Sequence, residues 1–195
     1  MRRVNNDIKR EFINKWVKPG SKVLDIGCGQ GGDLHKWKAL NVKLTGIDPN
    51  PMAIKEAQKR AALILPSAKF KVGTILDAVY KDSYDVICYN FSIQYEDPKN
   101  YKYIKTLLNP GGYLLGITPD KTRFQFAKEE GIIMDEISEN KVSVWIPDTP
   151  YYKDGPVPEP IIDPEIFIYN MAQIGLDKVL FGESFSIYSK FIFKS

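Results

Sequence analysis

The sequence is poor in the residues that build metal centres and disulfide frameworks, because it has one histidine and two cysteines among 195 residues. The cysteines, Cys28 and Cys88, are too few for a disulfide scaffold and are not spaced like metal ligands. His35 alone cannot support a histidine-rich zinc site, and a Ser-His triad would have to use it. We therefore expect no metal centre and a reducing intracellular setting, in the nucleus or the cytoplasm.

Long apolar runs are also missing. Segments such as 61–65 are far shorter than the roughly 20 residues that cross a bilayer, and Arg2 and Arg3 are not followed by the apolar stretch of an export signal. The net charge of +3 permits an anionic partner without indicating a polybasic surface. With 44% hydrophobic residues the chain can bury a sizeable core, so we expect one domain over residues 1–195 and no membrane partner.

Strand-like and helix-like segments alternate along the chain, which indicates an α/β fold with a mainly parallel sheet and helices on both faces. We expect seven strands, with a final antiparallel strand after the short connection 182–184. Six prolines between residues 147 and 164 exclude a continuous helix or a central strand, so we expect a structured surface loop that carries Tyr151 and Tyr152. The expected strands are 22–26, 43–47, 69–72, 84–89, 113–117, 177–181 and 185–193; the expected helices are 4–16, a helix from 33, 51–65, 100–108, 121–130 and 164–174, with a hairpin at 136–146.

A glycine-rich loop, Gly27-Cys28-Gly29-Gln30-Gly31-Gly32, follows the first expected strand and precedes a helix. Asp48 ends the second strand 21 residues after Gly27, where a carboxylate would meet the ribose of a bound nucleoside. Glycines are needed because the backbone turns sharply and a ligand must approach it closely. Dinucleotide-binding loops have the same spacing, and a sheet-to-helix turn without a ligand is the plainer alternative.

Two further acids favour a cofactor without a diphosphate. Asp25 precedes the loop and Asp33 opens the helix, where a diphosphate would otherwise use the positive helix end. Two carboxylates there would repel a diphosphate but suit S-adenosylmethionine, which presents a sulfonium and an ammonium. Asp77, after the third strand, is placed to accept from an adenine amino group, although a turn cap is the commoner role of an isolated loop aspartate.

The segment 23–34, Val-Leu-Asp-Ile-Gly-Cys-Gly-Gln-Gly-Gly-Asp-Leu, resembles the first motif of class I S-adenosylmethionine-dependent methyltransferases, and in particular the mRNA cap guanine-N7 methyltransferases. Segments 5–9, 90–95, 157–159 and 186–191 extend the likeness along nearly the whole chain. It implies a Rossmann-like methyltransferase domain, with the N-terminal helix within 1–20 over the cofactor site and a substrate-side hairpin and proline-rich loop at 132–164. It implies cofactor contacts from Lys9, Asp25, Gly27, Gly29, Asp33, Asp48, Asp77 and Asn90, and a cap-guanine pocket of Asn5, Phe91, Gln94, Tyr95, Glu159 and Tyr188.

The implied reaction is methyl transfer to N7 of the terminal guanine of capped RNA by in-line displacement, with S-adenosylhomocysteine as product. Guanine N7 carries a lone pair and no proton, so the displacement needs no general base. Phe91, Tyr95 and Tyr188 offer flat faces for a purine, and Glu159 can accept from the guanine N1–H and exocyclic amine. Glu159 and Tyr188 are therefore the expected catalytic residues.

Two positions depart from the family pattern, since Gln94 stands where the family usually has histidine and Gln30 where it usually has lysine. A glutamine amide can still donate to guanine O6, but loss of the lysine weakens contact with the cap phosphates. The likeness is to a minimal or viral-type enzyme, or to one module of a longer capping polypeptide. Its partners would be the capped RNA 5′ end and other capping-enzyme domains or a stimulatory subunit. A methyltransferase with a small-molecule or protein acceptor, and a catalytically silent cap-binding or regulatory subunit, remain as alternatives.

Overall fold

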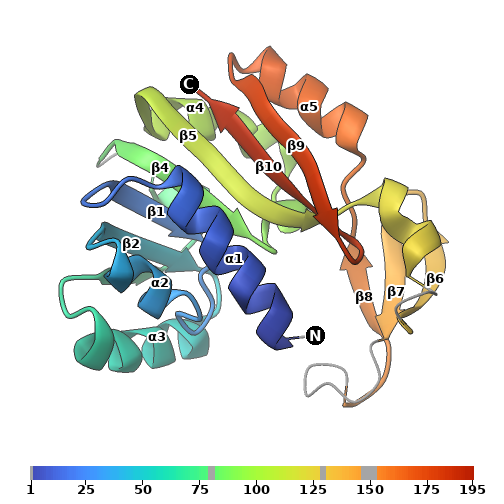
Figure 1. Ribbon diagram of the computed structural model, residues 1–195, viewed down its shortest axis with the longest axis horizontal. Coiled ribbons are helices and arrows are strands. Elements are labelled where there is room, and N and C mark those ends of the chain that lie inside the picture. Colours follow the sequence, from blue (N-terminus) through green and yellow to red (C-terminus); the bar gives the residue numbers. More distant parts are fainter. Residues whose placement is uncertain (1, 79–81, 128–130, 146–152) are drawn as a thin grey trace.

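The structure is a computed structural model that describes residues 2–78, 82–127, 131–145 and 153–195. Seven of its strands form one sheet in the order β3-β2-β1-β4-β5-β10-β9 (Figure 1). Strands β1 to β5 pair in parallel, and β10 runs antiparallel to both β5 and β9. The expected α/β fold with a mainly parallel sheet is confirmed. The strands are β1 (Lys22–Ile26), β2 (Lys43–Asp48), β3 (Lys69–Val72), β4 (Tyr84–Asn90), β5 (Leu108–Pro119), β9 (Asp177–Phe185) and β10 (Tyr188–Lys194).

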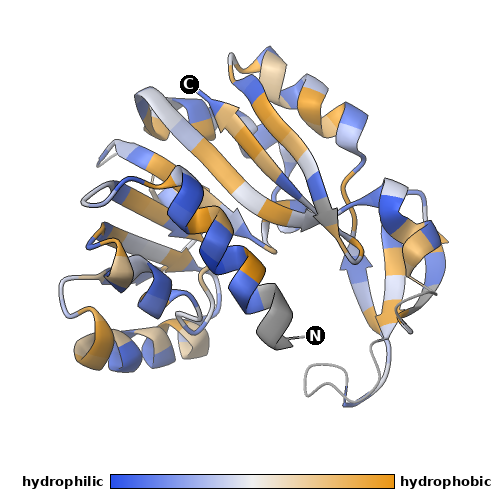
Figure 2. Ribbon diagram, in the orientation of Figure 1, coloured by the Kyte–Doolittle hydropathy of each residue, from blue (hydrophilic) through white to orange (hydrophobic). Residues whose placement is uncertain are grey.

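Helices cover both faces of this sheet (Figure 1). Helices α1, α2 and α3 pack over one face, where Phe12 and Trp37 are buried in one hydrophobic core. Helices α4 and α5 pack over the other face, where the ring of Phe167 meets that of Phe191 edge to face at 5.3 Å between centroids. Strands β5 and β10 each contribute apolar residues to the cores on both faces of the sheet (Figure 2). The helices are α1 (Arg2–Trp16), α2 (Leu34–Ala39), α3 (Pro51–Ile64), α4 (Tyr101–Leu107) and α5 (Pro164–Gln173), and short 3-10 turns are η1 (Ile75–Asp77), η2 (Ile93–Tyr95), η3 (Pro98–Asn100) and η4 (Lys121–Phe126).

A smaller sheet of order β6-β7-β8 lies beside the β9-β10 hairpin (Figure 1). Strands β6 (Ile133–Ser138) and β7 (Lys141–Trp145) form the expected hairpin, and β8 (Val157–Pro160) pairs antiparallel with β7. The proline-rich segment is therefore not all loop, because an edge strand tolerates proline where a central strand does not. Tyr151 and Tyr152 lie outside the described residues.

Three other expected boundaries were wrong. The connection expected at 182–184 lies inside β9, and the hairpin closes instead at Ser186 and Ile187. The helix expected at 121–130 is the short 3-10 turn η4, and residues 128–130 lie outside the description. Strand β5 begins at Leu108, with an irregularity opposite β4 before the regular pairing starts. Within the described ranges, no helix is long and apolar enough to span a membrane.

Candidate active site

The glycine loop turns from β1 into α2 at the carboxyl edge of the main sheet. Gly27 has a φ of 72°, and a Cβ at this position would lie 2.4 Å from the Cβ of Ser92 in the segment after β4. Gly29 has a φ of 53°, but no described atom lies within 4 Å of the place its Cβ would take. Position 27 therefore requires glycine for its packing against Ser92, whereas open space borders Gly29.

Asp48 lies beside the loop, as its place at the end of β2 predicts. Its Oδ2 accepts from the backbone N of Gly29 at 2.8 Å, and its Oδ1 accepts from the backbone N of Asn50 at 2.9 Å. The carboxylate thus ties the loop to the start of α3. Each carboxylate oxygen has a second lone pair, so Asp48 can also accept from a ribose hydroxyl.

Asp77 takes the role of a turn cap. Its Oδ2 accepts from the backbone N of Thr74 at 2.8 Å, and the Thr74 hydroxyl accepts from the backbone N of Leu76 at 3.3 Å. These bonds form a capping box around η1. The adenine contact of Asp77 stays a prediction.

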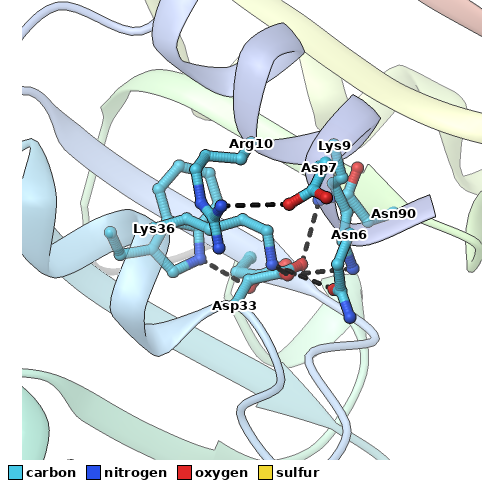
Figure 3. Close-up of polar contacts among 9 residues, drawn as sticks. Asn6, Asp7, Lys9, Arg10, Asp33, Lys36 and Asn90 are labelled. Atoms are coloured by element: carbon cyan, nitrogen blue, oxygen red, sulfur yellow. Dashed lines mark hydrogen bonds and ion pairs between the residues drawn. The ribbon is translucent and has the colours of Figure 1, made fainter. Parts of the chain in front are cut away.

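Asp33 is the centre of a buried charge network under α1 (Figure 3). Its Oδ1 lies 2.9 Å from Nζ of Lys9 and 2.7 Å from Nζ of Lys36, and its Oδ2 accepts from Nδ2 of Asn90 at 3.2 Å. Lys36 also donates to Oδ1 of Asn6 at 3.2 Å. Burial opposes ionisation of Asp33, but the two ammonium groups outweigh it and lower its pKa. Asp33 is therefore a carboxylate held between α1, α2 and the end of β4.

Asp25 is buried in β1, where its Oδ2 accepts from Nε1 of Trp37 at 3.0 Å. Burial, reinforced by the charge of Asp33, raises the pKa of Asp25 to about 7. One acid of the loop is thus paired with two lysines, and the other is about half protonated at neutral pH. The two acids therefore repel a diphosphate less strongly than their sequence positions suggest, and the choice of cofactor needs other support.

Among the described side chains expected to bind guanine, Phe91 and Tyr188 are in direct contact. Their rings meet edge to face with centroids 4.9 Å apart, and Nζ of Lys9 lies 5.5 Å from the centroid of the Phe91 ring. Phe91 has a φ of 60°, which is rare for a bulky residue and is often found at functional sites. Lys9 therefore connects the charge network around Asp33 with this aromatic pair.

Three polar residues, Gln94, Tyr95 and Glu159, complete the cluster. The hydroxyl of Tyr95 donates to Glu159, which joins the segment after β4 to β8. Nε2 of Gln94 donates to the carbonyl of Phe91 at 3.1 Å, while Oε1 of Gln94 is buried without a hydrogen-bond partner among the described residues. Asn5 lies in α1, but its side chain is outside the description.

Sequence reasoning missed Lys36, Trp37 and Ser92. Lys36 is only 5% exposed, which is unusual for lysine and is explained by its pairing with Asp33. The i,i+3 spacing of Asp33 and Lys36 on a helix was the available signal for that pair. Ser92, whose Oγ donates to the carbonyl of Ile26 at 2.7 Å, had no such local signal.

A cation lies beside Gln30, although the sequence has no lysine at this position. Arg60, on α3, donates from Nη1 to the carbonyl oxygen of Gln30 at 2.7 Å. A guanidinium from α3 therefore lies against the loop at Gln30, where the resembled family usually has lysine.

Neither cysteine is poised as a nucleophile. Burial raises the pKa of the Cys28 thiol, with further contributions from Asp25 and Asp48, and burial likewise raises that of Cys88. Both are neutral thiols at physiological pH. In the part of the chain that the structure describes, no group of three or more acidic, histidine or cysteine side chains is arranged to hold a metal ion.

Residues 17–165 match the methyltransferase domain family. The chain belongs to this family. The cofactor that goes with this membership is S-adenosylmethionine, so the predicted class I methyltransferase fold and its cofactor are confirmed.

Three relatives illustrate the similarity. The mRNA cap guanine-N(7) methyltransferase of Saccharomyces cerevisiae is 31% identical over 141 residues, which cover 62% of this chain and 32% of the relative. Phosphoethanolamine N-methyltransferase 1 of Arabidopsis thaliana is 31% identical over 140 residues, which cover 66% of this chain and 28% of the relative. A SAM-dependent methyltransferase from Methanosarcina mazei shares the fold with a TM-score of 0.70 and 20% identity, covering 94% of this chain and 96% of that chain. The match covers about a third of the length of the Saccharomyces cerevisiae relative and less than half of the Arabidopsis thaliana relative.

The residues at the carboxyl edge of the methyltransferase sheet fit this cofactor. Oδ1 of Asn90 is buried, and no described group donates to it, so an ammonium beside it would satisfy this acceptor. Asp48 has lone pairs for sugar hydroxyls, and open space borders Gly29. The arrangement suits a ligand that presents both an ammonium and a ribose, as S-adenosylmethionine does.

Proposed function

We propose that the chain transfers the methyl group of S-adenosylmethionine to N7 of the terminal guanine of capped RNA. The observation that carries the proposal is the contact of one ammonium, that of Lys9, with both Asp33 at 2.9 Å and the Phe91 ring at 5.5 Å. Charged groups suited to the cofactor therefore adjoin an aromatic and acidic cluster suited to a purine. The 31% identity to a cap guanine-N7 methyltransferase supports the same assignment.

The cofactor supplies, when bound, an electrophilic methyl group on a sulfonium. Asp33 and Asn90 can accept from its ammonium, and Lys9 can donate to its carboxylate. Asp48 is suited to the ribose hydroxyls and Asp77 to the adenine amino group. The residues assigned to cofactor binding are Lys9, Asp25, Gly27, Gly29, Asp33, Asp48, Asp77 and Asn90.

Guanine recognition depends on Glu159 in this proposal. Its carboxylate can accept from N1–H and the exocyclic amine of guanine, a pair of donors that adenine does not present on that edge. Tyr95 orients Glu159 through their hydrogen bond, and the second amide hydrogen of Gln94 can donate to O6. The residues assigned to the guanine pocket are Asn5, Phe91, Gln94, Tyr95, Glu159 and Tyr188.

No residue of the chain has to act as a base, because guanine N7 has a lone pair and no proton. The chain contributes orientation, which is worth up to roughly 7–11 kcal/mol in favourable cases. Glu159 adds electrostatic support for the positive charge that the purine gains, and Tyr188 holds the ring in place. These two residues are the proposed catalytic residues.

Methyl transfer to the dinucleotide GpppA, with identification of the methylated atom, tests the proposal, and N7 is the expected position. Glu159→Gln puts an amide donor toward the guanine donors, so kcat/KM should fall by about tenfold or more, while the affinity for S-adenosylmethionine stays within about twofold. Glu165→Gln, on the exposed side of α5, is the matched control and should leave turnover unchanged. Binding of the cofactor without methylation of GpppA, or full turnover by Glu159→Gln, contradicts the proposal.

A small amine acceptor is the second candidate, and the similarity to phosphoethanolamine N-methyltransferase 1 favours it. Such an amine is protonated at neutral pH and must lose a proton before it attacks, whereas guanine N7 need not. Offering GpppA and phosphoethanolamine together separates the two, because only the true acceptor takes the label. A silent cap-binding or regulatory subunit would show no thermal stabilisation by S-adenosylmethionine.

A further inference from the structure

Asp120, at the end of β5, is a buried acid that belongs to neither the cofactor set nor the guanine set. It is only 3% exposed. Its Oδ1 accepts from the backbone N of Thr122 at 2.8 Å and from Oγ1 of Thr122 at 2.7 Å, and its Oδ2 accepts from Oγ of Ser189 at 2.5 Å. A local cap of η4 needs only the bonds from Thr122, so the bond from Ser189 on β10 indicates a second role.

The backbone around Asp120 joins two other segments to the end of β5. Its N–H donates to the carbonyl of Ile187 at 2.9 Å, between β9 and β10. Lys121 donates from its backbone N to the carbonyl of Ile162 at 3.0 Å, and Ile162 donates back to the carbonyl of Pro119 at 3.1 Å. The end of β5 therefore holds both the β9-β10 hairpin and the segment that follows β8.

Each of these two segments carries one residue of the guanine set close to its hydrogen bonds with the end of β5. Ser189 directly follows Tyr188, and Tyr188 pairs in register with Pro119. Ile162, which bridges to Asp120, comes three residues after Glu159. A shift of either segment relative to β5 changes the separation of Tyr188 and Glu159.

We propose that Asp120 is a positioning residue that fixes Tyr188 and Glu159 relative to each other and so shapes the acceptor pocket. The identity of the acceptor rests on the proposed function, but the mechanical coupling of the two residues does not. Asp120→Asn tests the coupling, because an amide has one acceptor oxygen instead of two. While that oxygen keeps both bonds from Thr122, Ser189 can no longer donate to this side chain and would have to accept from Nδ2 instead. Ser189→Ala removes the same bond while leaving both bonds from Thr122, and it decides the outcome if Asp120→Asn does not fold.

Fluorine NMR of the chain labelled with 3-fluorotyrosine reports directly on the surroundings of Tyr188 and Glu159. Tyr188 reports the β10 side, and Tyr95, whose hydroxyl donates to Glu159, reports the β8 side; each resonance is identified by its loss in the Tyr→Phe variant. Asp85→Asn is the matched control, because the Asp85 carboxylate also joins two segments but lies at the opposite edge of the sheet. It accepts from the backbone N of Lys22 and from Nδ2 of Asn109, each at 2.8 Å. We expect Asp120→Asn to move both resonances, Ser189→Ala to move that of Tyr188, and Asp85→Asn to move neither.

Kinetics supply the second readout. Asp120→Asn should raise KM for GpppA by about fivefold, the factor that corresponds to one ordinary hydrogen bond, with a smaller change in kcat. Its dissociation constant for S-adenosylmethionine should stay within about twofold, whereas Asp85→Asn should lower the melting temperature without changing KM. An unmoved Tyr188 resonance in Ser189→Ala, which removes the bond in either direction, together with unmoved resonances of Tyr188 and Tyr95 in Asp120→Asn, overturns the proposal. A wild-type chain that does not methylate GpppA refutes the proposed function alone, and the fluorine result then decides the role of Asp120.

Discussion

Alanine at Gly27 and alanine at Gly29 should separate the structural role of the glycine loop from its ligand-facing role. Both positions have left-handed backbone, with φ of 72° and 53°, which costs a residue with a Cβ roughly 1–2 kcal/mol. At position 27 the new methyl group also lies 2.4 Å from the Cβ of Ser92. Overpacking of this kind costs typically about 1–3 kcal/mol more. We expect the free energy of unfolding to fall by roughly 2–5 kcal/mol in Gly27→Ala and by roughly 1–2 kcal/mol in Gly29→Ala.

Urea unfolding of the two variants without cofactor measures this difference, which corresponds to about 2–12 °C in melting temperature for a chain of this size. The loss of thermal stabilisation by S-adenosylhomocysteine should follow the opposite order and be greater in Gly29→Ala than in Gly27→Ala. In Gly29→Ala the methyl group projects into the open space beside the loop, so we expect this variant to fold and to lose most of the thermal stabilisation by S-adenosylhomocysteine.

The double variant Gly27→Ala/Ser92→Gly isolates the steric part of the cost. Ser92→Gly alone loses the bond from Oγ to the carbonyl of Ile26, but in the double variant it also removes the Cβ that the new methyl group meets. The two substitutions should therefore couple favourably by roughly 1–3 kcal/mol. Equal stability of the two alanine variants, or the absence of coupling in the double variant, would refute the reasoning.

Two further predictions concern charge. The pKa of Asp25 is raised to about 7 from an ordinary value of 3.8. Between these pH values the folded chain holds a proton that the unfolded chain has lost, so its stability falls as pH rises from about 4 to 7. Asp25→Asn, whose amide oxygen can still accept from Trp37, should flatten that fall in urea unfolding, and an unchanged slope would contradict the raised pKa. Arg60→Ala removes a cation beside Gln30 that could contact the cap phosphates, so it should raise KM for GpppA by about twofold to fivefold. Lys59→Ala, exposed on the same helix, should not raise KM. Equal KM values in both variants would exclude a contact between Arg60 and the cap phosphates.

Local signals in the sequence were sufficient where a few neighbouring residues decide the structure. Asn50 and Pro51 predicted the start of α3, and Oδ1 of Asn50 accepts from the backbone N of Met52 and Ala53. The glycine loop and Asp48 were likewise placed correctly, because a strand, a tight turn and the next parallel strand bring their carboxyl ends to one edge.

The same signals were misleading where long-range pairing decides. Glycine at position 182 suggested a turn, but its φ of 137° is accommodated within β9, and the hairpin turns at Ser186 with a φ of 52°. The pairing of β10 with residues 113–119 of β5 sets this register, and no residue near the turn encodes it. The prolines of β8 were also misread, because their tolerance depends on the strand lying at an edge.

The position of Lys9 shows why residue types could be predicted and their pairing could not. Phe12 and Ile13, on the same helix as Lys9, are buried in the core beneath α1, and each contributes roughly 1.5–3 kcal/mol by burial. The ion pair of Lys9 with Asp33 contributes less, because removing both charges from water offsets their attraction. Apolar packing therefore brings α1 to the sheet, and the ion pair then selects the geometry in which Lys9 also lies over Phe91. Since this packing is a property of the whole core, a motif around Lys9 identifies the residue but not its partners.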